Sequence, residues 1–171
     1  MSLWIFAYGS LMTKPTFDYV EKAPATLLGH SRCFCIVSHV WRGTPEQPGL
    51  VVGLVPGGTC EGFAFRIAPE NEDEALSATD RVELIRDVYH RKSVSLVLTD
   101  GRNVEAQAYL TNLDSSEFRE YSSEEKARMI STAMGRNGSS AQYLADLRER
   151  LSELSILDDE VETLYRLVFK R

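Results

Sequence analysis

Tyr8, Gly9, Ser10 and Leu11 are the residues of this 171-residue sequence that most readily suggest chemistry. They follow the apolar run 3–7, which is typical of a buried strand. A glycine and a serine directly after such a strand predict a tight loop whose backbone N–H groups point outward, and glycine lets a ligand approach the main chain closely. Amides arranged in this way can hold a carboxylate or stabilise an oxyanion. An ordinary turn explains the same residues equally well.

A carboxylate is the candidate for acid–base chemistry. Asp80 and Glu83 lie at the end of a helix that the pattern predicts over residues 69–85. Apolar neighbours, Val82 and Leu84, flank Glu83, so partial burial is expected, and burial raises the pKa of a carboxyl group toward values useful in general acid–base catalysis. The alternative is that this cluster is a solvated, charged helix end.

Other catalytic motifs are missing from the sequence. It contains no nucleophile elbow, phosphate-binding loop, dinucleotide-binding glycine set, zinc-protease helix or EF-hand loop. The three histidines, at positions 30, 39 and 90, lack the spacing of metal ligands and are interpreted as structural or surface residues. We therefore expect neither a metal nor a cofactor.

The cysteines also argue against a metal site. Cys33 and Cys35 lie two residues apart on a predicted strand, so their Cα atoms would be about 6.6 Å apart, near the limit of disulfide geometry. The third cysteine, Cys60, completes no C-x-x-C pair. We expect free, buried thiols that pack as small apolar groups. The sequence places none of them beside a base, and a thiol-redox role of Cys33 and Cys35 remains an alternative.

The elements that must position these residues are mostly strands in the first two-thirds of the chain. Apolar alternation and intervening glycines and prolines predict strands at 3–7, 32–38, 50–55, 60–67, 88–98 and 103–111. Asp100 and Gly101 predict a short hairpin loop between the last two.

The last third of the chain is predicted to be helical. Capping-box patterns at 122–125 and 139–142 begin two helices, the first ending near Gly135. One apolar face of the second helix carries Leu144, Leu147, Leu151 and Leu154, and a final helix carries Val161, Leu164, Tyr165 and Val168. Strands first and helices last favour an α+β fold with a small antiparallel or mixed barrel and flanking helices. We expect a single domain over residues 1–171, whose helical part runs from about 122 to 171.

Composition restricts the classes of partner. A net charge of −6 with no cluster of Lys and Arg argues against nucleic acid. The start of the chain has no basic segment, and its apolar run is too short for a signal peptide or a membrane span. We expect a cytoplasmic protein, a monomer or weak dimer, that acts on a small molecule and binds no membrane.

Several segments together resemble the ChaC-type γ-glutamylcyclotransferases. They are FAYGSLM (6–12), LGHSRCFC (28–35), SHVWRGTPEQPGL (38–50), LVPGG (54–58), EGFAFR (61–66), DRVEL (80–84) with VY (88–89), and GRNGSSAQYL (135–144). Each piece alone is unspecific, but the set occurs in order over about residues 4–157.

The resemblance implies a small β-barrel with flanking helices and cleavage of glutathione to 5-oxoproline and Cys-Gly. The catalytic glutamate of the family falls on Glu83. The substrate-binding loop of the family falls on Ala7, Tyr8, Gly9, Ser10, Leu11 and Met12. Because glutathione is anionic, a local cation is needed, and Arg42 is the candidate for a carboxylate clamp; the alternative is that Arg42 forms a surface ion pair. Tyr143 either hydrogen-bonds the substrate or Glu83, or packs in the core.

The implied reaction is an intramolecular acyl transfer, in which the α-amine of the γ-glutamyl unit attacks its own side-chain carbonyl. One carboxylate, Glu83, could take the proton from the amine and return it to the leaving amine. Two alternatives stay open: a cyclotransferase for other γ-glutamyl amines or amino acids, and a non-catalytic protein that binds γ-glutamyl peptides.

Overall fold

A computed structural model describes residues 1–170. The chain forms two compact units. The first comprises Met1–Arg32 and Leu54–Leu113, and the second comprises Cys33–Gly53 and the chain from Asp114 onward.

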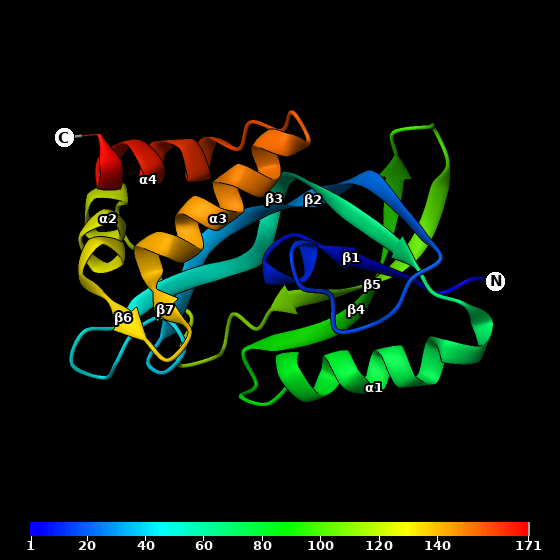
Figure 1. The fold of residues 1–171 in the computed structure, drawn as a ribbon, viewed down its shortest axis with the longest axis horizontal. Helices are drawn as coiled ribbons and strands as arrows, with labels where there is room; N and C mark the ends of the chain where they lie inside the picture. Colours follow the sequence, from blue (N-terminus) through cyan, green and yellow to red (C-terminus); the bar gives the residue numbers. More distant parts are fainter. Residues whose placement is uncertain (171) are drawn as a thin grey trace. The chain divides into compact units, whose positions relative to one another are not determined.

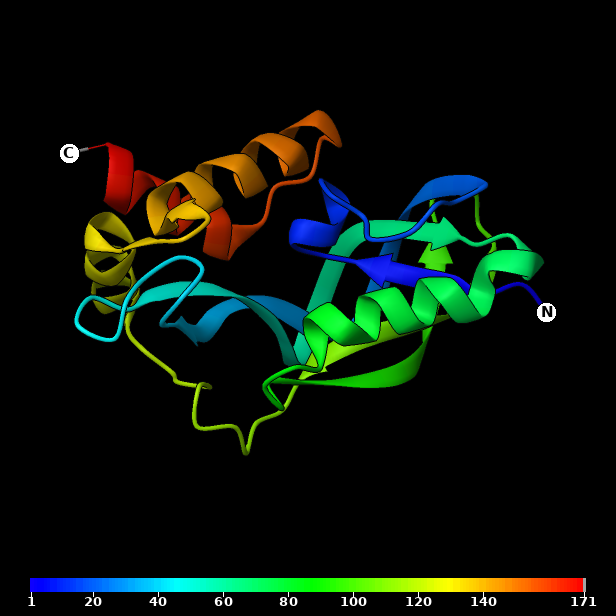
Figure 2. The same cartoon turned by 60° about the horizontal axis from the view of Figure 1, so that its bottom comes forward.

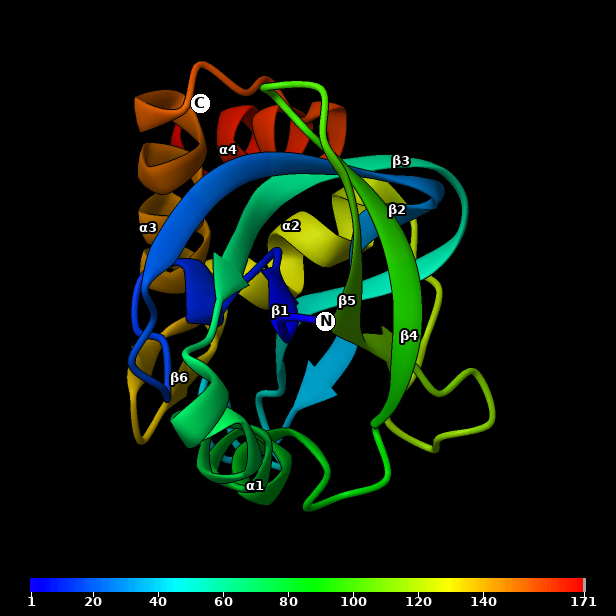
Figure 3. The ribbon, with the colours of Figure 1, turned by 90° about the vertical axis from the view of Figure 1, so that its right-hand side faces the viewer.

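A closed barrel of five strands is the framework of the first unit. Its strands are β1 (Trp4–Ala7), β2 (Glu21–Ser38), β3 (Gly49–Arg66), β4 (Tyr89–Leu98) and β5 (Asn103–Thr111). Around the barrel their order is β1-β3-β2-β4-β5, and the β1–β5 pair is parallel, whereas β1 pairs β3 in antiparallel fashion (Figure 3). All four residues of β1 are buried, as expected of an apolar strand with neighbours on both sides.

One α-helix accompanies the barrel. A short 3-10 turn (Pro69–Asn71) leads into α1 (Glu72–Glu83), which runs along the outside of the barrel (Figure 2). The acidic first turn of α1 suits a helix N-terminus, and Glu72 accepts a hydrogen bond from the Leu3 amide at 2.9 Å. The hydroxyl groups of Thr16 and Thr79 form a second link, at 2.8 Å, between α1 and the segment after β1.

Three mutually packed helices dominate the second unit (Figure 1). They are α2 (Ser123–Thr132), α3 (Ser140–Glu153) and α4 (Asp159–Phe169), with a two-stranded hairpin, β6 (Met134–Gly135) and β7 (Gly138–Ser139), before α3. The Ser122 capping box has both of its hydrogen bonds to Glu125. At the start of α3 the Ser139 hydroxyl accepts from the Gln142 amide, and the buried Ser140 hydroxyl bonds both the amide and the carbonyl of Leu50.

The predicted α+β architecture is confirmed, and so is the hairpin at Gly101, whose φ is +90°. The strand predictions were wrong in the longest strands. Residues 32–38 form only the end of β2, and the predicted strands 50–55 and 60–67 are one continuous β3. Their middles escaped prediction because they lack apolar alternation: Leu28 is 62% exposed, and Gly57 and Gly58 have φ of +100° and +75°. The β6–β7 hairpin was also missed.

Gly62 allows β3 to lie close to the end of β1. A Cβ atom there would lie 2.3 Å from the carbonyl oxygen of Ala7 and 3.2 Å from the Phe6 ring. We expect Gly62→Ala to lower the free energy of unfolding by roughly 1–3 kcal/mol, because backbone must move to make room. Urea denaturation measures the loss. Thr59→Ala, at an exposed position of the same strand, is the control, and equal stability of the two variants would show that the contact relaxes at no cost.

Candidate active site

Tyr8 fixes the predicted loop at two points. It directly follows β1 and is 8% exposed. Its hydroxyl donates to the carbonyl oxygen of Tyr109 on β5 at 2.6 Å. Its own carbonyl oxygen accepts from Nε of Arg32 on β2 at 2.8 Å. The loop therefore begins at a residue held from two different strands.

Arg32 is a buried guanidinium, only 4% exposed. Besides binding the Tyr8 carbonyl, it donates through a terminal nitrogen to the carbonyl of Glu61 on β3 at 2.7 Å. Burying a charge is costly unless its donors are satisfied, and the fork of an arginine can satisfy several carbonyls at once. Arg32 thus ties the loop to β2 and β3.

The loop continues as a 3-10 turn over Ser10–Met12. Its first hydrogen bond runs from the Met12 amide to the Gly9 carbonyl at 3.0 Å. The amides of Gly9 and Ser10 precede that donor, as expected at the start of a helical turn. Leu11 and Met12 are buried, whereas Ser10 is exposed, so the loop is anchored by its apolar side chains with its polar residue at the surface.

Glu83 is the last residue of α1, and Asp80 fixes that end of the helix. The carboxylate of Asp80 accepts from the Tyr109 hydroxyl at 2.7 Å and from the Arg91 guanidinium at 2.5 Å. Tyr109 therefore links the two parts of the site. Its carbonyl oxygen accepts the hydrogen bond from the Tyr8 hydroxyl, and its own hydroxyl donates to Asp80 in the helix turn that ends in Glu83.

Burial tunes the acid–base properties of this region. The Glu83 carboxyl is only partly exposed, and desolvation raises its pKa from 4.5 to about 7. Burial, and then the hydrogen bond to Asp80, also raise the pKa of Tyr109, so its hydroxyl stays protonated and remains a donor. A carboxyl group that titrates near neutral pH can both accept and donate a proton there.

Arg42 and Tyr143 lie in the second unit, close to one another. The Arg42 guanidinium carbon lies 5.4 Å from the centre of the Tyr143 ring, and one of its nitrogens donates to the Ser139 carbonyl at 3.3 Å. The Tyr143 hydroxyl accepts from the Val52 amide at 3.3 Å, and its ring packs edge-on against Phe34. The packing role of Tyr143 is thus observed, and a substrate contact of either residue stays a prediction.

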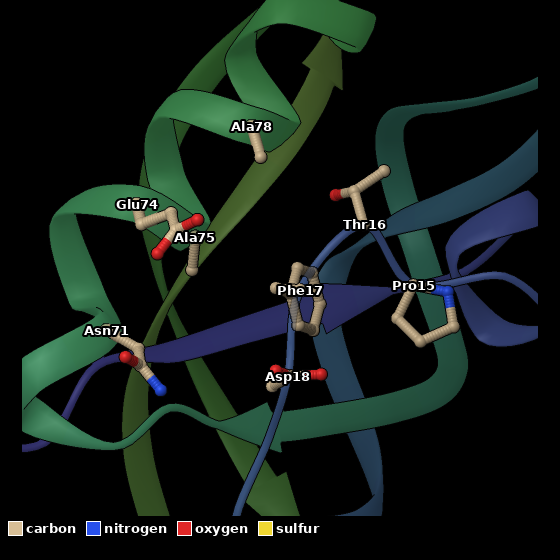
Figure 4. A pocket seen from close by; sticks show the side chains of 8 residues that line it. All are labelled: Pro15, Thr16, Phe17, Asp18, Asn71, Glu74, Ala75 and Ala78. Atoms are coloured by element: carbon tan, nitrogen blue, oxygen red, sulfur yellow. The ribbon is translucent and has the colours of Figure 1, made fainter.

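A cavity of about 390 Å³ lies beside α1 in the first unit (Figure 4). It is lined by Pro15, Thr16, Phe17, Asp18, Asn71, Glu74, Ala75 and Ala78. Glu83 is five residues beyond Ala78, about 7.5 Å further along the helix axis. None of the residues predicted from the sequence lines this cavity, so it carries no part of the candidate site.

Sequence reasoning missed Arg32, Tyr109 and Asp80 as parts of the site. An arginine directly before the apolar run 33–37 was a usable signal, because a charge at such a position must be paired or bonded. The bond between Tyr109 and Asp80 joins residues 29 positions apart and left no local signal. The prediction of free cysteines is confirmed, but that of burial is wrong for Cys33, which is partly exposed.

Comparison with known proteins identifies the family. A family model described as "ChaC-like protein" matches residues 3–171. The chain belongs to the ChaC-like family. Among curated relatives, the "Glutathione-specific gamma-glutamylcyclotransferase" of Escherichia coli (strain K12) is 35% identical over 166 residues, covering 95% of this chain and 71% of the relative. "Glutathione-specific gamma-glutamylcyclotransferase 1" of Danio rerio is 33% identical over 153 residues, covering 86% of this chain and 78% of the relative.

The fold of this ChaC-like protein is also that of a solved structure. The crystal structure of the glutathione-specific γ-glutamyl cyclotransferase from yeast superposes with a TM-score of 0.90 at 23% identity, covering 99% of this chain and 96% of the other. Within residues 1–170 no cluster of three or more His, Cys, Asp or Glu side chains could hold a metal ion. In the same part of the chain no helix is long and apolar enough to cross a membrane.

The raised pKa of Glu83 predicts a pH-dependent difference in stability between the wild type and Glu83→Gln. The folded state keeps the proton up to about pH 7, whereas the unfolded chain releases it near 4.5, so unfolding becomes easier as the pH rises between these values. Glutamine carries no charge to desolvate. We therefore expect the Tm of Glu83→Gln minus that of the wild type to increase from pH 5 to pH 8 in calorimetric scans.

Glu74→Gln provides the control for this measurement, because Glu74 is an exposed carboxylate of the same helix. Its Tm difference from the wild type should stay nearly constant over that range. A Glu83→Gln difference that is equally constant would mean that Glu83 is a solvated helix-end charge.

Proposed function

We propose that this protein cleaves glutathione to 5-oxoproline and Cys-Gly, with Glu83 as the general base and acid and the 8–11 loop as the substrate-binding loop. The activity follows from relatives whose names specify that enzyme. One observation supports the site: Tyr109 binds both Tyr8, where the loop begins, and Asp80, in the helix turn that ends in Glu83, whose pKa burial raises to about 7.

The reaction needs no second substrate. The nitrogen of the γ-glutamyl α-amine attacks the γ-carbonyl carbon, a five-membered ring closes, and the bond to the cysteinyl nitrogen breaks. Nucleophile and electrophile belong to one molecule, so the enzyme's task is to fold the substrate into the attacking conformation and to move protons.

Glu83 performs the proton transfers in this proposal. The α-amine is protonated near neutral pH and must lose a proton before it attacks, and the leaving nitrogen must gain one to depart. A carboxyl group with a pKa of about 7 is well matched to both steps. Acid–base catalysis of this kind contributes about 10²–10⁴ in rate.

In this proposal the 8–11 loop binds the negatively charged oxygen atoms of the substrate. In this proposal the amides of Gly9 and Ser10 donate either to the tetrahedral oxygen or to the α-carboxylate of the substrate. The bond from Arg32 to the Tyr8 carbonyl polarises the Tyr8–Gly9 peptide, which makes the Gly9 N–H a stronger donor. A buried cation thus assists the loop without contacting the substrate.

Other expectations belong to the same proposal. Arg42 as a carboxylate clamp, Tyr143 as a substrate contact, a cytoplasmic location and a monomeric or weakly dimeric state all stay predictions. The competing functions, turnover of another γ-glutamyl compound or binding without turnover, are distinguished by incubating the protein with glutathione, γ-Glu-Ala and γ-glutamyl-lysine and measuring 5-oxoproline.

Glu83→Gln tests the catalytic role. Glutamine keeps the shape of glutamate but cannot take a proton from an ammonium or return one, so we expect kcat for 5-oxoproline release from glutathione to fall at least about 10²-fold while much of the substrate affinity remains. Glu74→Gln serves as the control, with circular dichroism to establish that each variant is folded. Asp80→Asn is unsuitable as a control, because Asp80 binds Tyr109 and Arg91. Wild-type turnover by folded Glu83→Gln would remove Glu83 from the mechanism.

Gly9→Val tests the loop. A β-branched side chain at position 9 would stand between the amides and an approaching ligand, so we expect glutathione binding, measured by calorimetry, to weaken at least about tenfold. Thr13→Val, at an exposed position just after the loop, should bind as the wild type does. If the Gly9→Val protein folds, binds and turns over normally, residues 8–11 are only a turn.

A further inference from the structure

The three cysteines differ in accessibility. Cys35 and Cys60 are 0% and 1% exposed, whereas Cys33 is partly exposed, and all three are free thiols. Cys33 lies on the part of β2 that belongs to the second unit. A reagent in solution can therefore reach Cys33 more readily than the other two.

A lysine is held against Cys33. The Nζ atom of Lys126, on α2, lies 3.5 Å from the Cys33 sulfur and 2.7 Å from Oε1 of Glu160 on α4. The Lys126 side chain is only 9% exposed, unusual for a residue type that almost always reaches solvent. The ion pair with Glu160 fixes the ammonium beside the thiol.

Cys35 first, and Lys126 second, favour the thiolate form of Cys33. Burial acts to lower the pKa of Lys126, but Glu160 and Cys33 outweigh it and raise that pKa, so the lysine stays charged. The hydrogen bond from Cys35 lowers the pKa of Cys33, and Lys126 adds to this effect against the opposing influence of burial and Glu160. The bond to Cys33, together with burial, raises the pKa of Cys35.

We propose that Cys33 is a modification site: a thiolate, paired with the Lys126 ammonium, that forms mixed disulfides with small disulfide compounds. The Cys33 sulfur attacks one sulfur of R–S–S–R and the S–S bond breaks. The second sulfur leaves as RS⁻, which takes a proton from solvent. Cys33 is oxidised to the mixed disulfide, and the released thiol is the reduced product.

The Cys35 thiol donates a hydrogen bond to the main-chain carbonyl oxygen of Cys33 at 3.5 Å. It is buried and its pKa is raised, so it is a poor attacking thiol. Two residues apart along a strand, its Cα lies about 6.6 Å from that of Cys33, near the limit of disulfide geometry. The mixed disulfide should therefore persist instead of resolving to a Cys33–Cys35 disulfide.

The experiment uses the folded, full-length protein and bis(2-hydroxyethyl) disulfide, a probe without a γ-glutamyl group, so the result does not depend on the proposed enzyme activity. We expect intact mass to show one adduct at pH 7, which peptide mapping assigns to Cys33 and dithiothreitol removes. Cys33→Ser should form none. Absence of an adduct, or equal modification of Cys35 or Cys60, would overturn the proposal.

Two substitutions of opposite expected effect test the charge pairing. Lys126→Met removes the stabilising cation and should slow alkylation of Cys33 by iodoacetamide at pH 7 by about tenfold, the change that one pKa unit produces. Glu160→Gln removes the opposing anion and should accelerate it about threefold. Lys126→Arg, which keeps the charge, should react nearly as the wild type does.

Loosening of the structure would instead accelerate alkylation in both Lys126→Met and Glu160→Gln. Changes in the same direction would therefore overturn the role of Lys126. If Lys126→Met does not fold, Lys126→Gln, which also removes the positive charge, takes its place, and its alkylation should be slower than that of Lys126→Arg.

Discussion

The candidate site depends on the buried guanidinium of Arg32. A buried positive charge is tolerated only when its donors find acceptors, and here those acceptors include the main-chain carbonyls of Tyr8 and Glu61. Meeting that requirement fixes the point at which the chain leaves β1, and with it the direction in which the following amides point. The dependence is mutual, because the buried guanidinium is stable only while the barrel holds these carbonyls within hydrogen-bonding distance.

Tyr109 extends this constraint to the helix. It lies on β5, which pairs with β1 in the barrel, and its two polar groups face two partners, Tyr8 and Asp80. Because Asp80 lies one turn before Glu83, the strand that holds the loop also holds the end of α1. The proposed base is positioned through its helix, so its own carboxyl group is left to exchange protons.

The parts of this site that the sequence could predict are the local ones. An apolar run followed by Gly9 and Ser10 predicted a strand and loop. Partial burial of Glu83 was also predicted, in line with its raised pKa, but the reason given was wrong, because the flanking Val82 and Leu84 are themselves 57% and 36% exposed. The capping box at Ser122 was equally readable. Arg32, Tyr109 and Asp80 were not, since their roles arise from partners 24 to 101 positions away that only barrel closure brings together. The sequence also failed to predict that β3 continues through Pro56 and Gly57. There, pairing with neighbouring strands overrides the local preference of these residues for a turn.

The two titratable groups singled out here are tuned by different physical means, and this sets how each responds to change. Desolvation raises the pKa of Glu83, so any substitution that admits water near the end of α1 should return it toward 4.5, whichever residue is changed. The pKa of Cys33 depends on burial as well, but also on three named groups with opposing effects: Cys35 and Lys126 favour the thiolate, and Glu160 disfavours it. Its reactivity can thus rise or fall with a single substitution, whereas the basicity of Glu83 is a property of its whole surroundings.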